Sequence, residues 1–131
     1  MSNLRYVKAK VILQEDQKPV TRCFFVAAET FGHAEQVIAE ETGSTEYTAM
    51  EFVSFNGGLK ESKGEFLFKV ASDLVTVNEV TGKEQRTRLC TLVWGDDVEG
   101  VTELMRREKD DSEELAEVKK LNVVGIIGGR P

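Results

Sequence analysis

Apolar and polar residues alternate in two runs near the start of the chain. From Arg5 to Leu13 every second residue after the first is apolar, and this period of two predicts a strand. A second run, from Val20 to Ala28, predicts a strand with apolar residues on both faces. Cys23 and Phe25 lie on one face, and Phe24 and Val26 lie on the other. The polar segment Gln14–Pro19 predicts the turn that joins the two strands into a hairpin.

The period then changes to that of a helix. Thr30 is a suitable N-cap, and the helix is expected to run to about Glu41, where Thr42-Gly43-Ser44 ends it. A third strand is expected over Glu46–Phe55, closed by Asn56-Gly57-Gly58. The apolar stripe that this helix would bury consists of Phe31, Ala34, Val37 and Ile38.

The second half of the chain repeats this order. Strands are expected over Glu65–Val77 and Gln85–Trp94, joined by a turn at Thr81-Gly82. Asp96, with Glu99 three residues later, has the spacing of a capping box at the start of a second helix. An acidic stretch follows, and then a last strand is expected over Leu121–Ile127. The stripe of the second helix is Val98, Val101, Leu104 and Met105.

The two halves can be superposed, and this predicts an internal duplication. With a longer second hairpin and a longer final connection, Lys10 falls on Lys69 and Gly57-Gly58 falls on Gly128-Gly129. The alternative is that the halves did not arise by duplication, since any two segments with the order strand-strand-helix-strand share this hydrophobic periodicity. The other aligned pairs are Cys23 with Cys90, Phe25 with Leu92, Phe31 with Val98, Ala34 with Val101 and Val37 with Leu104.

We therefore expect an α+β fold built from a duplicated ββαβ unit. Antiparallel sheets would pack against two helices in a pseudo-twofold arrangement, because one unit alone cannot cover both faces of its hairpin. The expected organisation is a single domain over residues 1–131, with one repeat at about 5–58, a linker at about 59–64 and a second repeat at about 65–131.

Two segments, together with the order of elements and the length, carry a resemblance. Ala28–Glu35 reads Ala-Glu-Thr-Phe-x-x-Ala-Glu, and the hairpin tip Val80–Glu84 reads Val-x-Gly-Lys-Glu. The chain resembles a family of short proteins from Bacteroidetes-type bacteria and their phages, catalogued as a domain of unknown function (DUF4494-like). Gly32-His33 departs from the polar residues expected at that helix start. The resemblance implies no catalytic residues.

Composition and charge narrow the expected function and location. The 131 residues carry a net charge of −6, which disfavours generic nucleic-acid binding. No apolar stretch approaches the roughly 18 residues that span a bilayer, so we expect no membrane association. Cys23 and Cys90 lack the CxxC spacing of a redox or zinc site, which favours the reducing cytoplasm of a bacterium or a phage-infected cell.

Candidate catalytic residues each have a simpler structural role. His33 is the one histidine and falls at the start of the first helix, and Cys23 lies within an apolar strand. Asp96, Asp97 and Glu99 are the acidic residues that a helix N-terminus favours. The sequence therefore predicts a non-catalytic protein with no metal and no cofactor, and an uncharacterised enzyme is the second alternative.

Two groups of residues are candidates for binding an anion. Gly128 and Gly129, followed by Arg130, would form a concavity of backbone N–H groups, unless they are simply a strand end with a flexible tail. A second group surrounds the later hairpin and helix, where the arginines would otherwise pair with nearby acidic side chains. This group consists of Arg86, Arg88, Arg106 and Arg107, with Lys83 beside them.

The most concrete hypothesis is a homo-oligomeric binding protein that holds or sequesters an anionic, nucleotide-like small molecule. Phages and bacteria use small oligomeric proteins in this way, so the resemblance adds to this hypothesis by analogy. The alternative is a protein–protein interaction module or inhibitor, which would use an exposed edge strand or the acidic stretch Glu108–Glu114.

Overall fold

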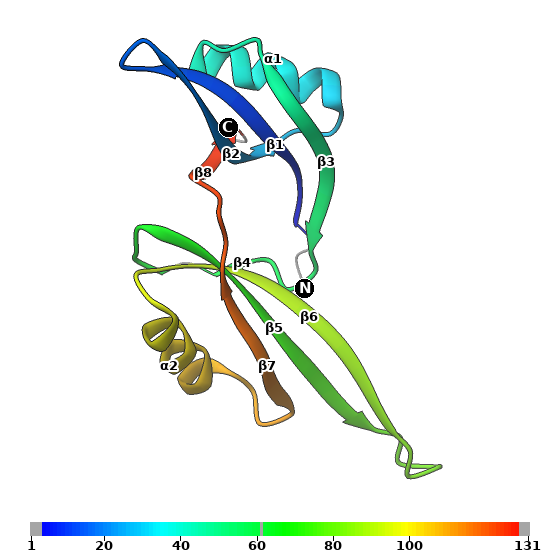
Figure 1. Ribbon diagram of the computed structural model, residues 1–131. Helices are drawn as coiled ribbons and strands as arrows, with labels where there is room; N and C mark the ends of the chain where they lie inside the picture. Colours follow the sequence, from blue (N-terminus) through cyan, green and yellow to red (C-terminus); the bar gives the residue numbers. More distant parts are fainter. Residues whose placement is uncertain (1–3, 61, 129–131) are drawn as a thin grey trace. The chain divides into compact units, whose positions relative to one another are not determined.

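The computed structural model describes residues 4–60 and 62–128, and these residues form an α+β fold with two helices and two four-stranded sheets (Figure 1). Its elements in chain order are β1 (Leu4–Glu15), β2 (Lys18–Ala27), α1 (Phe31–Thr42), β3 (Tyr47–Phe55), β4 (Leu59–Lys60), β5 (Phe66–Val77), β6 (Glu84–Gly95), α2 (Val98–Glu108), β7 (Glu113–Lys120) and β8 (Gly125–Gly128).

The chain divides into two compact units. The first unit combines Arg5–Ser54 with the segment that begins at Asn122, and its sheet has the order β3-β1-β2-β8. The second unit is Phe55–Leu121 together with Leu4, and its sheet has the order β4-β6-β5-β7. Whether the two units make one domain, as the sequence predicts, stays a prediction.

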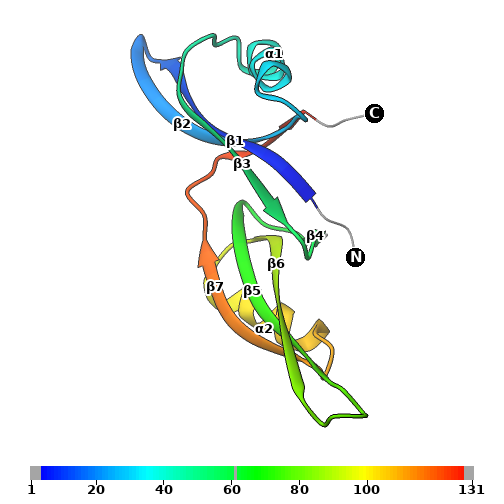
Figure 2. The same ribbon diagram turned by 90° about the vertical axis from the view of Figure 1, so that its right-hand side faces the viewer.

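In the first unit, α1 lies on one face of the sheet (Figure 2). Thr30 is its N-cap as expected, and Gly43 ends it in the left-handed conformation at φ 77°. The β1–β2 turn is tighter than the predicted segment 14–19, because the strands stay paired as far as Glu15 and Lys18. The core beneath α1 consists of Val7, Ala9, Val11, Phe24, Val26, Ala28, Ala34, Val37 and Ile38.

In the second unit, α2 packs on one face of the sheet in the same manner. Its N-cap is Asp97 and not Asp96, because the Asp97 carboxylate accepts a hydrogen bond from Gly100 N. Asp96 instead accepts from Glu65 N, so the predicted capping box is wrong. The core beneath α2 consists of Phe68, Val70, Val93, Val101 and Met105.

The strand β7 lies where the sequence predicts an acidic connection. A β-bulge explains the error, since Ala71 pairs with Glu117 while Ser72 pairs with Leu115. The extra residue leaves Leu115 and Val118 three positions apart, although both pack against the core beneath α2. A spacing of three does not indicate a strand.

The short strands β4 and β8 are both parallel to their neighbours. β8 pairs with β2 and so completes the first sheet, whereas the sequence predicts that Leu121–Ile127 closes the second repeat. β4 pairs with β6 and lies inside the predicted linker 59–64. Each sheet therefore gains an edge strand that lies outside the ββαβ segment forming the rest of it.

Strand register also corrects two predicted correspondences between the halves. Gly57 N donates to Cys90 O, and Val124 N donates to Cys23 O. Taken with the predicted match of Cys23 and Cys90, these bonds pair Gly57 with Val124, which differs from the predicted match of Gly57-Gly58 with Gly128-Gly129.

The second correction concerns a lysine. Lys69 lies opposite Leu92, and Lys8 lies opposite Phe25, the residue aligned with Leu92. Under the predicted match of Phe25 with Leu92, register pairs Lys69 with Lys8, whereas the predicted superposition pairs it with Lys10.

Candidate functional site

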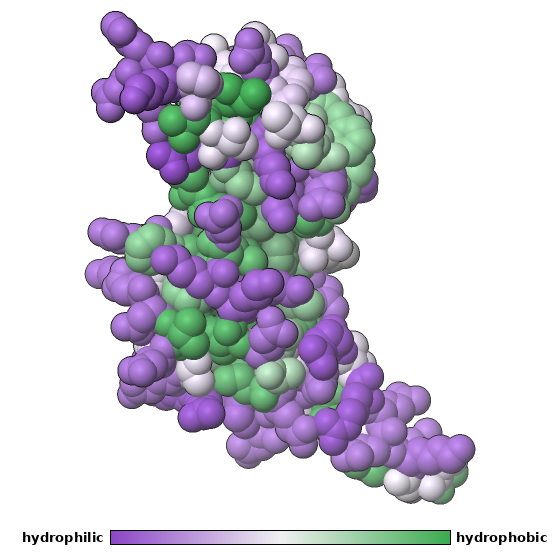
Figure 3. Space-filling view, in the orientation of Figure 1, coloured by the Kyte–Doolittle hydropathy of each residue, from purple (hydrophilic) through white to green (hydrophobic). Residues whose placement is uncertain are grey.

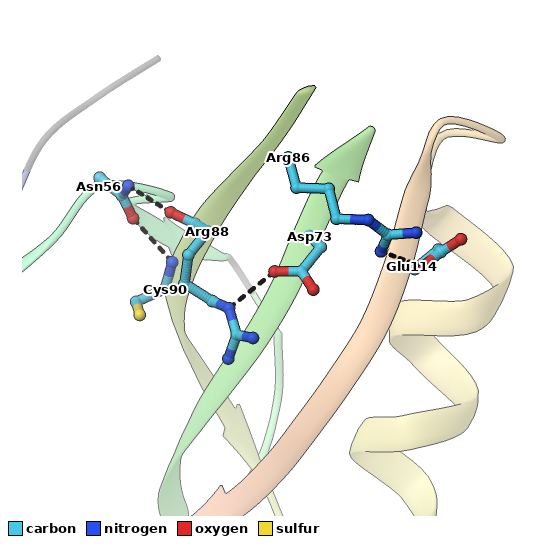
Figure 4. Close-up of polar contacts among 6 residues, drawn as sticks. All are labelled: Asn56, Asp73, Arg86, Arg88, Cys90 and Glu114. Atoms are coloured by element: carbon cyan, nitrogen blue, oxygen red, sulfur yellow. Dashed lines mark hydrogen bonds and ion pairs between the residues drawn. The ribbon is translucent and has the colours of Figure 1, made fainter. Parts of the chain in front are cut away.

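Two of the predicted arginines lie on the face of the second sheet that is turned away from α2. Arg88 Nε donates to Asp73 Oδ1 at 2.7 Å, and Arg86 Nη1 donates to Glu114 Oε2 at 2.7 Å (Figure 4). Register explains the first pair, because Asp73 lies directly opposite Arg88. Arg86 lies opposite Val75, and its side chain reaches Glu114 of β7 across β5. Opposite charges at directly facing positions stabilise neighbouring strands.

This row of charges is not a positive pocket. Arg86 also lies 4.0 Å from Glu84, so the two arginines share the face with at least three carboxylates. The hydrogen bond from Arg86 to Glu114 raises the pKa of the guanidinium, which stays charged. Arg86 and Arg88 thus form ion pairs with nearby acidic side chains, which is the alternative that the sequence offers to an anion site. An anion would have to compete with these carboxylates.

The other two predicted arginines belong to the last turn of α2. Arg107 lines a hollow of about 460 Å³ together with Lys63, Trp94 and the two aspartates that precede the helix. Arg106 lines two other hollows, one formed by α2 alone and one formed by α2 and β7. Within the described residues neither arginine forms an ion pair with a carboxylate.

The C-terminal glycines fall partly outside the described residues. Gly128 ends β8 at φ 80°, and a Cβ atom there would lie 2.9 Å from Val37 Cγ1. Glycine at position 128 therefore allows both the left-handed backbone and the close packing against α1. Gly129 and Arg130 lie outside the described residues, so the anion-binding concavity proposed for this segment stays a prediction.

The surroundings of Cys23 disfavour its reactive form. Burial raises the pKa of the Cys23 thiol, and the nearby Lys8 and Lys10 lower it by less. A raised pKa leaves less of the reactive thiolate. His33 is exposed on α1, and the described part of the chain holds no group of three His, Cys, Asp or Glu side chains that could bind a metal.

A different feature stands out on β6, and it depends on Asn56. The Asn56 side chain donates from Nδ2 to Arg88 O at 2.8 Å and accepts at Oδ1 from Cys90 N at 2.7 Å (Figure 4). It thereby bonds to β6 as a strand backbone would. Leu92 N then donates to Gly58 O, and β4 continues the coverage to Val93.

The close approach of this segment to β6 requires glycine at position 57. A Cβ atom on Gly57 would lie 2.1 Å from Thr91 Oγ1 and 3.0 Å from Cys90 O. From the sequence, Asn56-Gly57-Gly58 predicts only a turn. The missed signal is that an asparagine followed by two glycines also suits a side chain and a backbone lying flat along a strand edge.

Coverage of β6 stops at Arg88. From Glu84 to Thr87 no described residue bonds to the outer edge of the strand. On the other side of the hairpin, β7 pairs with β5 only as far as Leu74, and Ser112 O accepts one further bond from Val75 N. We call the hairpin segment Thr76–Thr87 the arm.

The arm extends beyond β7 and α2 in both ribbon views. Figure 3 shows it as a narrow, mostly hydrophilic projection. Near its tip, Val77 is 60% exposed and Val80 is 94% exposed. The arm is thus a hairpin whose outer edges, together with two valines near the tip, are open to solvent.

Two exposed aromatic contacts were also missed from the sequence. Phe31, expected in the buried stripe of α1, is 42% exposed and stacks on Phe52, while the Arg5 guanidinium lies 4.1 Å from the Phe52 ring centre. Phe66, at the start of the predicted strand Glu65–Val77, is exposed, and Lys120 Nζ lies 3.7 Å from its ring centre. Both phenylalanines are the first residue of their element, where the buried face has not yet begun.

Neither helix in the described residues is long or apolar enough to cross a membrane.

Comparison with known proteins identifies the family of this chain. No match to the chain was found among curated proteins or among solved structures. The family model described as domain of unknown function (DUF4494) matches residues 2–128, nearly the whole sequence. The chain therefore belongs to the DUF4494 family, as its resemblance predicted.

Proposed function

We propose that this chain is a non-catalytic binding protein that takes up a strand of a protein partner along the outer edge of its arm. The observation that carries the proposal is the uncovered edge of β6 from Glu84 to Thr87, directly beyond the point where Asn56 ends its coverage. An open strand edge recognises an extended segment through main-chain hydrogen bonds.

The composition of this edge supports selective docking. Exposed edges are prone to nonspecific pairing, and charged side chains are the usual protection against it. On the arm, Glu84 and Arg86 alternate in sign along one face. A partner strand with the opposite order of charges would be accepted, and an apolar or wrongly charged strand would not.

A proline substitution tests the edge. The outward N–H of Glu84 is lost in Glu84→Pro, and the bonds between β6 and β5 are kept because they use the intervening residues. A photo-crosslinking residue in place of Val80 should then give one discrete protein adduct in the host cell, and Glu84→Pro should abolish it. Glu84→Gln is the matched control, since it keeps the N–H group. An adduct that persists with Glu84→Pro would contradict the proposal.

The hollow lined by Arg107 supports a second candidate, the binding of an anionic small molecule. Lys63 and Arg107 both line it, and Trp94 adds an aromatic residue. The aspartates there are already engaged, because Asp96 accepts from Glu65 N and Asp97 accepts from Gly100 N. Cations with no carboxylate partner among the described residues favour a phosphate or carboxylate ligand.

Native mass spectrometry of protein purified from its own host tests this candidate. The expected result is extra mass that denaturation releases as a nucleotide-like anion, lost in Arg107→Ala and kept in Arg86→Ala. Extra mass that survives Arg107→Ala, or a bare protein in every preparation, would count against the hollow as the site.

We also propose that the two units arose by duplication of a ββαβ segment, with a pseudo-twofold relation between the copies. In support, β3-β1-β2-β8 and β7-β5-β6-β4 have the same order of corresponding strands. Thr30 and Asp97 cap the two helices at aligned positions. Comparing the two halves across many family members tests the proposal, since a duplication predicts that they align better than shuffled sequences.

A further inference from the structure

The outward backbone groups of the arm belong to alternate residues. On β6, bonds to the Asn56 segment use Arg88 O, Cys90 N and Leu92 N, so the even-numbered residues direct their backbone away from β5. By the same alternation, Glu84 and Arg86 present free N–H and C=O groups. Their side chains share the face that carries the row of ion pairs.

We infer that the strand received by the arm is the same arm of a second copy of this chain, paired antiparallel about a twofold axis at Gln85. This inference rests on the proposed function, and it names the partner. In this register Glu84 of each copy lies opposite Arg86 of the other, and both residues use their free backbone groups. The contact is isologous, as a twofold interface requires.

Charge selects this register among the antiparallel ones. Moving the axis to Glu84 would place the two glutamates opposite each other, and moving it to Arg86 would face the two arginines. Like charges at directly opposed positions destabilise a pair of strands. An axis at Gln85 is the one choice near the centre of the free edge that opposes unlike charges at both positions.

The length of the free edge fits the same axis. Asn56 already occupies Arg88 O, which ends the available strand on one side. On the other side the tip turns back on itself, since Gly82 N donates to Asn78 O. With the axis at Gln85, Arg88 of one copy lies opposite Gly82 of the other. The end of the free edge in one copy therefore meets the start of the tip turn in the other.

The contact is small, and this sets the expected behaviour. It consists of a few main-chain hydrogen bonds and two ion pairs, well below the area of a permanent interface. Dimerisation should therefore depend on concentration, and sedimentation velocity up to about 1 mM protein is the suitable measurement.

Charge reversal tests the register. Glu84→Arg and Arg86→Glu should each weaken dimerisation about tenfold or more, because each creates two like-charge contacts per dimer. An equimolar mixture of these two variants should dimerise again, since every opposed pair is then unlike in charge. Glu79→Arg, which makes the same charge change in the exposed tip outside the paired segment, is the control and should leave dimerisation unchanged.

The outcomes separate this inference from the proposed function. A wild-type chain that stays monomeric throughout overturns the inference, while crosslinking to a different protein would leave the open edge as the binding site. A dimer that both charge reversals leave intact also overturns the inference. If Glu84→Pro affects neither dimerisation nor crosslinking, the proposed function fails as well.

Discussion

The Asn56 side chain should determine how strongly the Cys90 amide of β6 is protected from hydrogen exchange. Asn56→Ala removes two hydrogen bonds, to Arg88 O at 2.8 Å and from Cys90 N at 2.7 Å. Each is worth about 0.5–1.5 kcal/mol net, and because the site is exposed, water would replace part of that. We therefore expect a loss of about 1 kcal/mol in the local free energy of opening, which corresponds to about fivefold faster exchange of the Cys90 amide.

Asn56→Asp separates the two bonds. A carboxylate still accepts from Cys90 N, but it has no proton for Arg88 O and places an oxygen against that carbonyl. The Cys90 amide should therefore stay protected in Asn56→Asp, although the free energy of unfolding falls. The assay is residue-resolved hydrogen exchange by NMR, with urea denaturation alongside.

Asn78→Ala is the matched control for these variants. Asn78 Oδ1 accepts from Val80 N and Thr81 N at the arm tip, so this variant also loses two side-chain hydrogen bonds but should leave exchange at Cys90 unchanged. Unaltered exchange at Cys90 in Asn56→Ala, or lost protection in Asn56→Asp, would refute the assignment of Asn56 as a substitute for strand backbone.

Three further predictions concern the first unit. Ile38→Ala, at a fully buried position beneath α1, should cost about 2–5 kcal/mol in urea denaturation, and a loss below about 1 kcal/mol would contradict its place in the core. The hydrogen bond from Arg22 lowers the pKa of Glu15, so the pair stabilises the fold above the ordinary glutamate pKa and loses this effect as pH falls through the native value. An NMR titration should show the Glu15 midpoint rising in Arg22→Gln, and an unmoved midpoint would exclude the pair in solution. Because burial raises the pKa of Cys23, its alkylation by iodoacetamide near neutral pH should be slower than that of the unfolded chain, and equal rates would count against this.

Local periodicity was enough to predict the hairpins and both helices. The alternation at Val7, Ala9 and Val11 and the helical spacing of Ala34 and Ile38 reflect single buried faces, so the pattern is strict. It fails at β7, where the bulge moves Leu115 and Val118 out of step. It fails for β4, which is too short to show a period, and it begins the last strand at Leu121 although β8 begins at Gly125.

The site was harder to predict because it depends on register. The sequence offers pairing with nearby acidic side chains as the alternative role of the β6 arginines, but the partners Asp73 and Glu114 come from two other strands. Glu114 belongs to β7, which the pattern did not reveal. The role of Asn56 depends on a backbone running beside β6 that only the folded chain brings there.

The parallel pairing of β8 with β2 has a consequence for how the protein is made. Phe25 lies beside Ile126, so this contact spans about a hundred residues and its closure entropy is high. During synthesis the first sheet must wait until β8 has left the ribosome before its last edge is filled. We expect β8 docking to be a late step, during which the edge of β2 is exposed to chaperones and to other nascent chains.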